Sequence, residues 1–166
     1  ATGVARLRAN GVRVDGAEPD DAQLCAAFRQ IEAARGAESL TYFEFNTLAA
    51  LLLFRASAVE VSVLEVGLGG RLDATNIIDA DVSVLCSVGL DHRDWLGDTL
   101  EQIGVEKAGI FRAGRAAILG NAGMPATVGR ALDALGVRPL VAGEDLRWQV
   151  HADGSWDFRA DDLELA

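Results

Sequence analysis

Residues 59–76 read VEVSVLEVGLGGRLDATN, a valine-rich run that passes into a glycine-rich loop and then into a polar segment. A second valine-rich run, at 82–88, also ends in a loop, at 89–97. Short apolar runs bounded by glycine are typical of parallel strands that are buried on both faces. We therefore predict two such strands, at 59–66 and 82–88, with a loop at the carboxyl end of each.

Helices and further strands are predicted on both sides of these two runs. In chain order we expect an extended pair at 4–14 with a turn at Asn10-Gly11, a helix from Pro19-Asp20-Asp21 to Gly36, a helix from Thr41 to Arg55, a helix from Asp98 or Thr99 through Lys107, a strand at 116–119, a helix at 125–135, a strand at 139–141 and a hairpin at 147–159 that turns at Asp153-Gly154. The helix after Thr41 is apolar nearly all round, so we expect it to be deeply buried. The alternation predicts an α/β fold over residues 1–166: a mostly parallel sheet with flanking helices and a terminal β-hairpin, forming one partial domain.

Composition excludes several classes of function. The 166 residues carry a net charge of −10, from 15 Lys and Arg against 25 Asp and Glu. Such an acidic chain disfavours binding to nucleic acid or to an anionic membrane. Neither a membrane-spanning run nor a signal peptide is evident, and Cys25 and Cys86 lack CxxC spacing. We therefore expect a cytoplasmic protein in which both cysteines are reduced core thiols and His151 is structural.

The two loops are the candidate site, because ligands of open α/β sheets gather at the carboxyl ends of the strands. A dinucleotide site is excluded, since Leu72 stands where GxGxxG needs a small residue, and no GxxxxGK[ST] occurs. The polar residues of the loops are Glu65, Asp73, Thr75, Asn76 and His92. Carboxylate oxygens suit Mg²⁺, and an imidazole is tolerated beside them.

Each candidate also has a purely structural explanation. Glu65 could be a buried acid paired with Arg71, and His92 could be a solvated loop residue. A helical lysine such as Lys107 is ordinarily at the surface. Helix capping accounts for Thr41, and core packing accounts for Phe43. From the residues alone, the sequence supports an α/β domain with a cation site.

Four segments, taken together, resemble the ATP-dependent central domain of the dihydrofolate synthase/folylpolyglutamate synthase family, within the Mur-ligase superfamily. They are residues 40–45 (LTYFEF), residues 64–76, Asp91-His92 with Trp95-Leu96-Gly97, and residues 106–111 (EKAGIF). Their order and spacing match from about Arg6 to Pro125. The resemblance implies a ligase in which ATP phosphorylates a folate or dihydropteroate carboxylate and the amine of L-glutamate then attacks the acyl phosphate.

The resemblance also implies roles for seven residues. Glu65 would bind the Mg²⁺ attached to the ATP phosphates, and His92 would bind a second Mg²⁺. Lys107 would be carbamylated by CO₂, which turns an ammonium into an anionic oxygen ligand. Thr41, Phe43, Asp73 and Ala74 match positions that contact the pterin. In that match Phe43 stacks on the ring, and the carboxylate of Asp73 accepts from its amino-pyrimidine edge.

The chain departs from the family pattern in three ways. The phosphate loop of the family is expected before residue 1, its carboxy-terminal domain is expected after residue 166, and Ala5 stands where the family often has Glu. We therefore expect an internal fragment that is inactive alone and that self-associates through exposed strand edges. Two other interpretations stay open: another Mur-superfamily amino-acid ligase, and a non-catalytic binding module with this fold.

Overall fold

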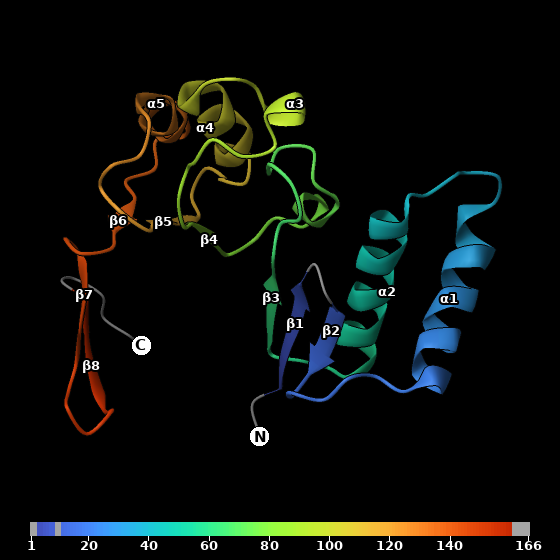
Figure 1. The fold of residues 1–166 in the computed structure, drawn as a ribbon. Coiled ribbons are helices and arrows are strands. Elements are labelled where there is room, and N and C mark those ends of the chain that lie inside the picture. Colours follow the sequence, from blue (N-terminus) through green and yellow to red (C-terminus); the bar gives the residue numbers. More distant parts are fainter. Residues whose placement is uncertain (1–2, 9–10, 161–166) are drawn as a thin grey trace. The chain divides into compact units, whose positions relative to one another are not determined.

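The computed structural model describes residues 3–8 and 11–160, which separate into two compact units (Figure 1). The first, here called the N-terminal unit, comprises Ala1–Leu68 and Asp73–Ile77. The second, the C-terminal unit, comprises Gly69–Leu72 and Ile78–Ala166. Most of the chain before residue 78 therefore belongs to the N-terminal unit, and the remainder to the C-terminal unit. The expectation that residues 1–166 form one partial domain stays a prediction.

The N-terminal unit contains a three-stranded sheet in the order β2-β1-β3. Strand β1 (Val4–Arg8) is antiparallel to β2 (Gly11–Val14) and parallel to β3 (Val61–Leu64). The register pairs Arg8 with Gly11, so Gly11 belongs to the strand and its prediction as a turn residue was wrong. Asn10, the other half of that predicted turn, lies outside the described residues.

Two capped helices complete the N-terminal unit, as predicted. Helix α1 (Asp21–Arg35) begins after Asp20, and α2 (Tyr42–Ala56) begins after Thr41 with the expected capping box. One side of α2 packs Ala50 and Phe54 against β1, and another packs Ala49 and Leu53 against α1. Because α2 is covered on two sides, its nearly continuous apolar surface is explained (Figure 1).

The C-terminal unit contains a parallel sheet in the order β4-β5-β6 and a separate antiparallel hairpin, β7-β8. Its elements are β4 (Val82–Leu85), α3 (Arg93–Leu96), α4 (Leu100–Ala108), β5 (Ala116–Leu119), α5 (Ala126–Leu135), β6 (Leu140–Val141), β7 (Leu146–Val150) and β8 (Trp156–Ala160). A core around Leu85, Leu119, Val128 and Leu132 joins the sheet to α5. This α/β arrangement of parallel strands, flanking helices and terminal hairpin confirms the predicted fold class.

The two valine-rich strands are parallel to their neighbours, but only one face of each is covered. Leu64 of β3 packs against the core beneath α2, and Leu85 of β4 packs in the core with α5. Val61 and Val63, on the other face of β3, are about half exposed at 47% and 48%. Val82 and Val84 of β4 are exposed at 52% and 50%. The prediction of burial on both faces was therefore wrong for the described chain.

Three further observations bear on smaller expectations from the sequence. Cys25 and Cys86 are free, as predicted, but both are exposed rather than part of the core. His151, which we expected to be structural, has a side-chain partner, since its Nε2 lies 3.0 Å from Oδ2 of Asp157 on β8. Within the described ranges, no helix combines the length and the apolar character needed to cross a membrane.

Candidate functional site

The loop that follows β3 is organised by the carboxylate of Asp73. Its Oδ2 accepts hydrogen bonds from the backbone N–H groups of Gly67 (3.0 Å) and Leu68 (3.1 Å). Its Oδ1 accepts from the backbone N–H of Thr75 (2.9 Å) and from the Thr75 hydroxyl (2.7 Å). An ionised carboxylate offers about four acceptor positions, so Asp73 engages both of its oxygens in closing the loop. The short 3₁₀ helix η1 (Ala74–Ile77) begins directly after it.

Phe43 and Asp73 lie against the same residue, Gly67. A Cβ atom added at Gly67 would stand 3.1 Å from Cζ of Phe43 and 3.4 Å from Oδ2 of Asp73. The first of these distances is tighter than ordinary van der Waals contact. The fold therefore brings together two of the four residues that were matched to pterin contacts, and a glycine keeps the space between the loop and the ring.

Thr41 caps the N-terminus of α2 through a reciprocal arrangement with Glu44. Its Oγ1 accepts from the backbone N–H of Glu44 (3.2 Å), and the Glu44 carboxylate accepts from the backbone N–H of Thr41 (2.7 Å). These hydrogen bonds from Thr41 lower the pKa of the Glu44 carboxyl. The Thr41 hydroxyl is thus engaged with Glu44 in the first turn of α2.

Glu65, which follows β3, is neither buried nor paired with Arg71. Its Oε2 lies 2.8 Å from Nε of Arg8 on the neighbouring strand, and half of its side chain is exposed. The guanidinium of Arg71 instead binds Glu106. The structural explanation of Glu65 as a buried partner of Arg71 is therefore wrong.

His92 follows β4 and has an unusual backbone. It precedes α3 with a φ of 50° and a ψ of 41°, the left-handed conformation that non-glycine residues avoid. Holding a non-glycine residue there costs about 1–3 kcal/mol, and such strain gathers at functional sites. The side chain is more than half exposed, and its Nε2 is 3.6 Å from Oδ2 of Asp91, too far for a strong hydrogen bond. The imidazole is therefore available to a ligand.

Lys107 lies in the last turn of α4 and is the only lysine in the sequence. The other 14 of the 15 basic residues are arginine. A lysine can lose its proton and form a carbamate, whereas arginine stays charged, so this single exception is a signal for special chemistry. Sequence reasoning overlooked it.

The predicted metal ligands are divided between the two units. Glu65 belongs to the N-terminal unit, whereas His92 and Lys107 belong to the C-terminal unit. Among the described residues, no group of three or more His, Cys, Asp or Glu side chains is gathered as a metal site. By donor chemistry, the carboxylate of Glu65 fits Mg²⁺ well, His92 fits as a minority ligand, and Lys107 fits only as a carbamate.

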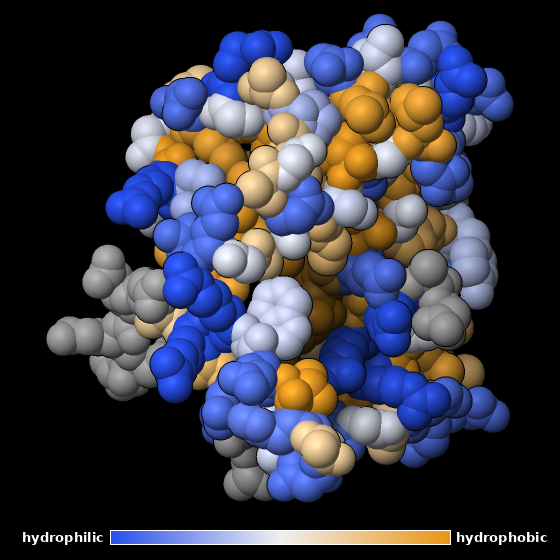
Figure 2. Space-filling model, turned by 60° about the vertical axis from the view of Figure 1, so that its left-hand side comes forward, coloured by the Kyte–Doolittle hydropathy of each residue, from blue (hydrophilic) through white to orange (hydrophobic). Residues whose placement is uncertain are grey.

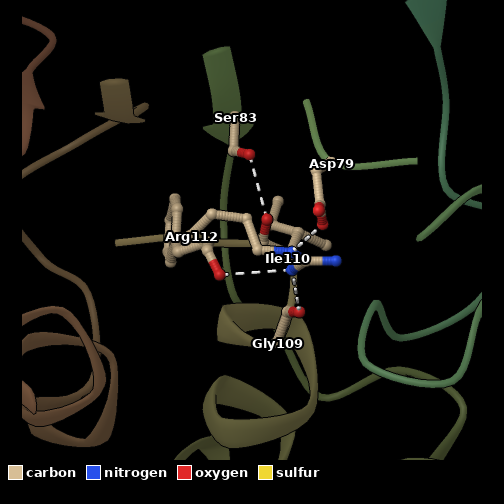
Figure 3. A network of polar contacts seen from close by, with 6 residues as sticks. Asp79, Ser83, Gly109, Ile110 and Arg112 are labelled. Carbon is tan, nitrogen blue, oxygen red and sulfur yellow. Dashed lines mark hydrogen bonds and ion pairs between the residues drawn. The ribbon is translucent and has the colours of Figure 1, made fainter. Parts of the chain in front are cut away.

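Sequence reasoning also missed a set of contacts around the end of α4, drawn in part in Figure 3. Arg71 binds Glu106, and Arg112 binds Asp79 in the loop between η1 and β4. The partners in these contacts are far apart in the sequence. The only feature that could have indicated the contacts was therefore the placement of Glu106 beside Lys107.

Comparison with solved structures defines the class of fold. The chain superposes on Escherichia coli FolC in complex with DHPP and ADP with a TM-score of 0.88, at 45% identity over 96% of this chain and 40% of that one. It superposes on the Yersinia pestis bifunctional folylpolyglutamate synthase/dihydrofolate synthase, complexed with AMPPNP and a Mn ion, with a TM-score of 0.87 at 41% identity, covering 98% of this chain and 41% of that one. The chain thus has part of a fold of the Mur-ligase type.

Sequence comparison identifies the family. The chain is 50% identical over 147 residues to the dihydrofolate synthase/folylpolyglutamate synthase of Escherichia coli, covering 89% of this chain and 35% of that protein. It is 45% identical over 155 residues to the Haemophilus influenzae protein of the same name, covering 93% of this chain and 35% of the relative. No family model matches the chain. The chain is homologous to one segment of the dihydrofolate synthase/folylpolyglutamate synthase family and spans about a third of the length of these relatives.

Proposed function

We propose that the chain is part of an ATP-dependent ligase that joins L-glutamate to dihydropteroate or folates. The observation that carries this proposal is the 50% identity to a dihydrofolate synthase/folylpolyglutamate synthase across 89% of the chain. The γ-phosphoryl group of ATP passes to a carboxylate oxygen of the folate, giving ADP and an acyl phosphate. The amine of glutamate attacks the acyl carbon, loses a proton and displaces inorganic phosphate, which leaves an amide.

The folate end of the reaction is assigned to Thr41, Phe43, Asp73 and Ala74. Their placement in one unit, with Phe43 and Asp73 both against Gly67, supports this assignment. Phe43 offers an aromatic face for stacking, and Thr41 places a hydroxyl oxygen, a hydrogen-bonding group, two residues before it. Because both oxygens of Asp73 already accept bonds within the loop, a pterin N–H group must share one of them with a backbone donor.

The phosphate end is assigned to Glu65, His92 and a carbamylated Lys107, which would hold Mg²⁺. When bound, such a cation supplies charge neutralisation for the phosphoryl groups. Support comes from the solved relatives, one of which carries AMPPNP and a Mn ion, from the strained backbone of His92 and from the uniqueness of Lys107. Glu65 and His92 contribute ligand atoms, and carbamylation removes the positive charge that would otherwise repel the cation.

An assay of the full-length parent protein tests the proposal. Purified protein is incubated with ATP, Mg²⁺ and L-glutamate, together with dihydropteroate, with a folate, or with a peptidoglycan-precursor carboxylate. We expect ADP and a glutamyl amide to form with dihydropteroate and with the folate, but not with the peptidoglycan precursor. Turnover only with the peptidoglycan precursor favours another Mur-superfamily ligase, and no turnover with any acceptor favours a non-catalytic binding module.

A further inference from the structure

The last turn of α4, which carries Lys107, is held by Arg71 through both main chain and side chain. The backbone N–H of Arg71 donates to the carbonyl oxygen of Glu106 at 2.8 Å. Its Nη2 lies 3.0 Å from Oε1 of Glu106, and its Nε lies 3.2 Å from both carboxylate oxygens. Arg71 therefore binds both the main chain and the side chain of Glu106, the residue that immediately precedes Lys107.

Two glycines allow this close approach. A Cβ atom at Gly70 would stand 2.9 Å from the carbonyl oxygens of both Glu106 and Lys107. A Cβ atom at Gly109 would stand 2.7 Å from Cα of Arg71. Each distance is shorter than real Cβ contacts. The loop segment that contains Arg71 thus lies directly on the end of the helix, where a side chain at either glycine would force the two apart.

The turn after Lys107 is held by hydrogen bonds from Arg112 and Ser83 (Figure 3). Nη1 of Arg112 donates to the carbonyl oxygen of Gly109 at 3.1 Å, and its Nε is 2.5 Å from Oδ1 of Asp79. The hydroxyl of the buried Ser83 donates to the carbonyl oxygen of Ile110 at 3.0 Å. The final carbonyl groups of a helix lack intrahelical partners, and cations near them complement the helix dipole. The backbone is therefore fixed on both sides of Lys107.

We propose that Arg71 and Glu106 form a positioning pair that fixes the backbone of Lys107 and so aims its side chain in the ligase reaction. The inference rests on the proposed function. A lysine side chain has a flexible stem of four carbons, so its amine can be placed reproducibly only from a fixed Cα. Through Glu106, Arg71 is held against the helix at the residue that precedes Lys107.

The exposure of the pair separates positioning from simple stabilisation. The Arg71 and Glu106 side chains are 52% and 25% exposed, and ion pairs near the surface contribute little to the free energy of unfolding. The Arg115–Asp81 pair in the same unit is a matched control, because its atoms are 2.6 Å apart and its side chains are 47% and 88% exposed. If Arg71 and Glu106 only stabilised the fold, breaking either pair would have the same small effect on turnover.

The test compares variants of the full-length parent enzyme. We expect Arg71→Met and Glu106→Gln each to lower kcat by about tenfold or more, the range found when outer groups that orient metal ligands are removed. The double variant should be no worse than the poorer single variant, because the two residues act as a unit. Arg71→Lys, which keeps the charge but not the planar fork, should recover part of the rate. Arg115→Met should stay within about twofold of the parent.

Hydrogen exchange provides a readout that does not depend on turnover. Amides in a peptide covering residues 104–111 should exchange faster in Arg71→Met than in Arg115→Met, with unchanged circular dichroism. Rates equal to the Arg115→Met control, or costs that multiply in the double variant, overturn the positioning role. Lys107→Ala separates the two failures: if it is inactive while Arg71→Met is normal, only this inference fails, and if it is fully active, the proposed role of Lys107 fails as well.

Discussion

The residues matched to folate binding and those matched to metal binding are organised in opposite ways. Thr41, Phe43, Asp73 and Ala74 all belong to the N-terminal unit. A helix cap and a loop closed by one carboxylate arrange them through contacts that are mostly local in sequence. In contrast, Glu65 belongs to one unit, and His92 and Lys107 belong to the other.

This difference teaches which half of the reaction depends on local folding. A local loop can form wherever its own residues fold, so the folate contacts need little beyond β3, α2 and η1. Lys107, in contrast, lies next to a long-range contact, because Arg71 and Glu106 pair across 35 residues of sequence. We therefore expect substitutions at the folate residues to change the KM for folate and substitutions around the metal residues to change kcat.

The largest effect is expected at Lys107 in the full-length parent. Lys107→Ala should lower kcat by more than about a hundredfold, because it deletes a proposed ligand and not merely its support. Lys107→Arg should fail as well, since guanidinium keeps its charge and forms no carbamate. Steady-state kinetics measures the loss, and circular dichroism checks folding, which alanine in a helix preserves.

Small carboxylic acids should partly restore turnover of Lys107→Ala by occupying the vacated ligand position. An ordinary surface lysine predicts the opposite, with near-parental rates in both variants and a change in stability of about half a kcal/mol at most. That outcome would contradict the assignment of Lys107 as a metal ligand.

A smaller, selective effect is expected from Gly67→Ala. The added Cβ would meet Phe43 and Asp73, so the KM for folate should rise by about tenfold while the KM for ATP stays unchanged. Gly129→Ala is the control, because a Cβ at Gly129 in α5 meets nothing within 4 Å. A rise in the KM for ATP of the same size would contradict the division between the two sites.

The isolated chain should self-associate through its half-exposed valine strands. β3 and β4 each lie at an edge of a three-stranded sheet, and both expose valines. Figure 2 shows that apolar residues, coloured orange, reach the surface on the face in view. Unpaired strand edges promote association, most simply as a two-fold dimer.

Light scattering of the isolated chain measures this association. Val63→Lys and Val84→Lys should each reduce it, because a charge on an edge strand disfavours pairing. Val105→Lys on α4 places the same charge at a residue of similar exposure, 48%, outside the sheets, and should leave association unchanged. A monomer at high protein concentration counts against the prediction.

The smallest effect concerns pH and the cap of α2. Hydrogen bonds from Thr41 lower the pKa of Glu44 in the folded chain, so the ionised carboxylate is favoured there. Its contribution to stability is present above the unfolded pKa and is lost as the pH falls through the lowered folded value. In the parent protein, thermal unfolding followed between about pH 2 and pH 7 should therefore show less acid sensitivity in Glu44→Gln than in the unaltered chain. Equal pH dependence in both would show that the cap does not depend on charge.

Local patterns in the sequence predicted most secondary structure correctly, for identifiable reasons. Asp20 and Thr41 precede α1 and α2 because their side chains accept from backbone N–H groups within the next three residues. The strand at Ala116–Leu119 was predicted with its observed bounds. The resemblance to a ligase family, confirmed by the comparisons, likewise depended on segments that are continuous in the sequence.

Only the tertiary structure decided which partners distant residues take and which faces are covered. Arg71 could have paired with Glu65, six residues away, yet it binds Glu106, 35 residues away. The valines of β3 and β4 resemble those of fully buried strands, but coverage depends on which other elements pack there, and one face of each strand stays exposed. The sequence by itself predicted the family and most helices and strands, because caps, turns and periodicity act over a few residues. It missed α3 and η1, two short helices within segments predicted as loops. Ion pairs and burial join residues that are distant along the chain, so the packing of helices on sheets determined them.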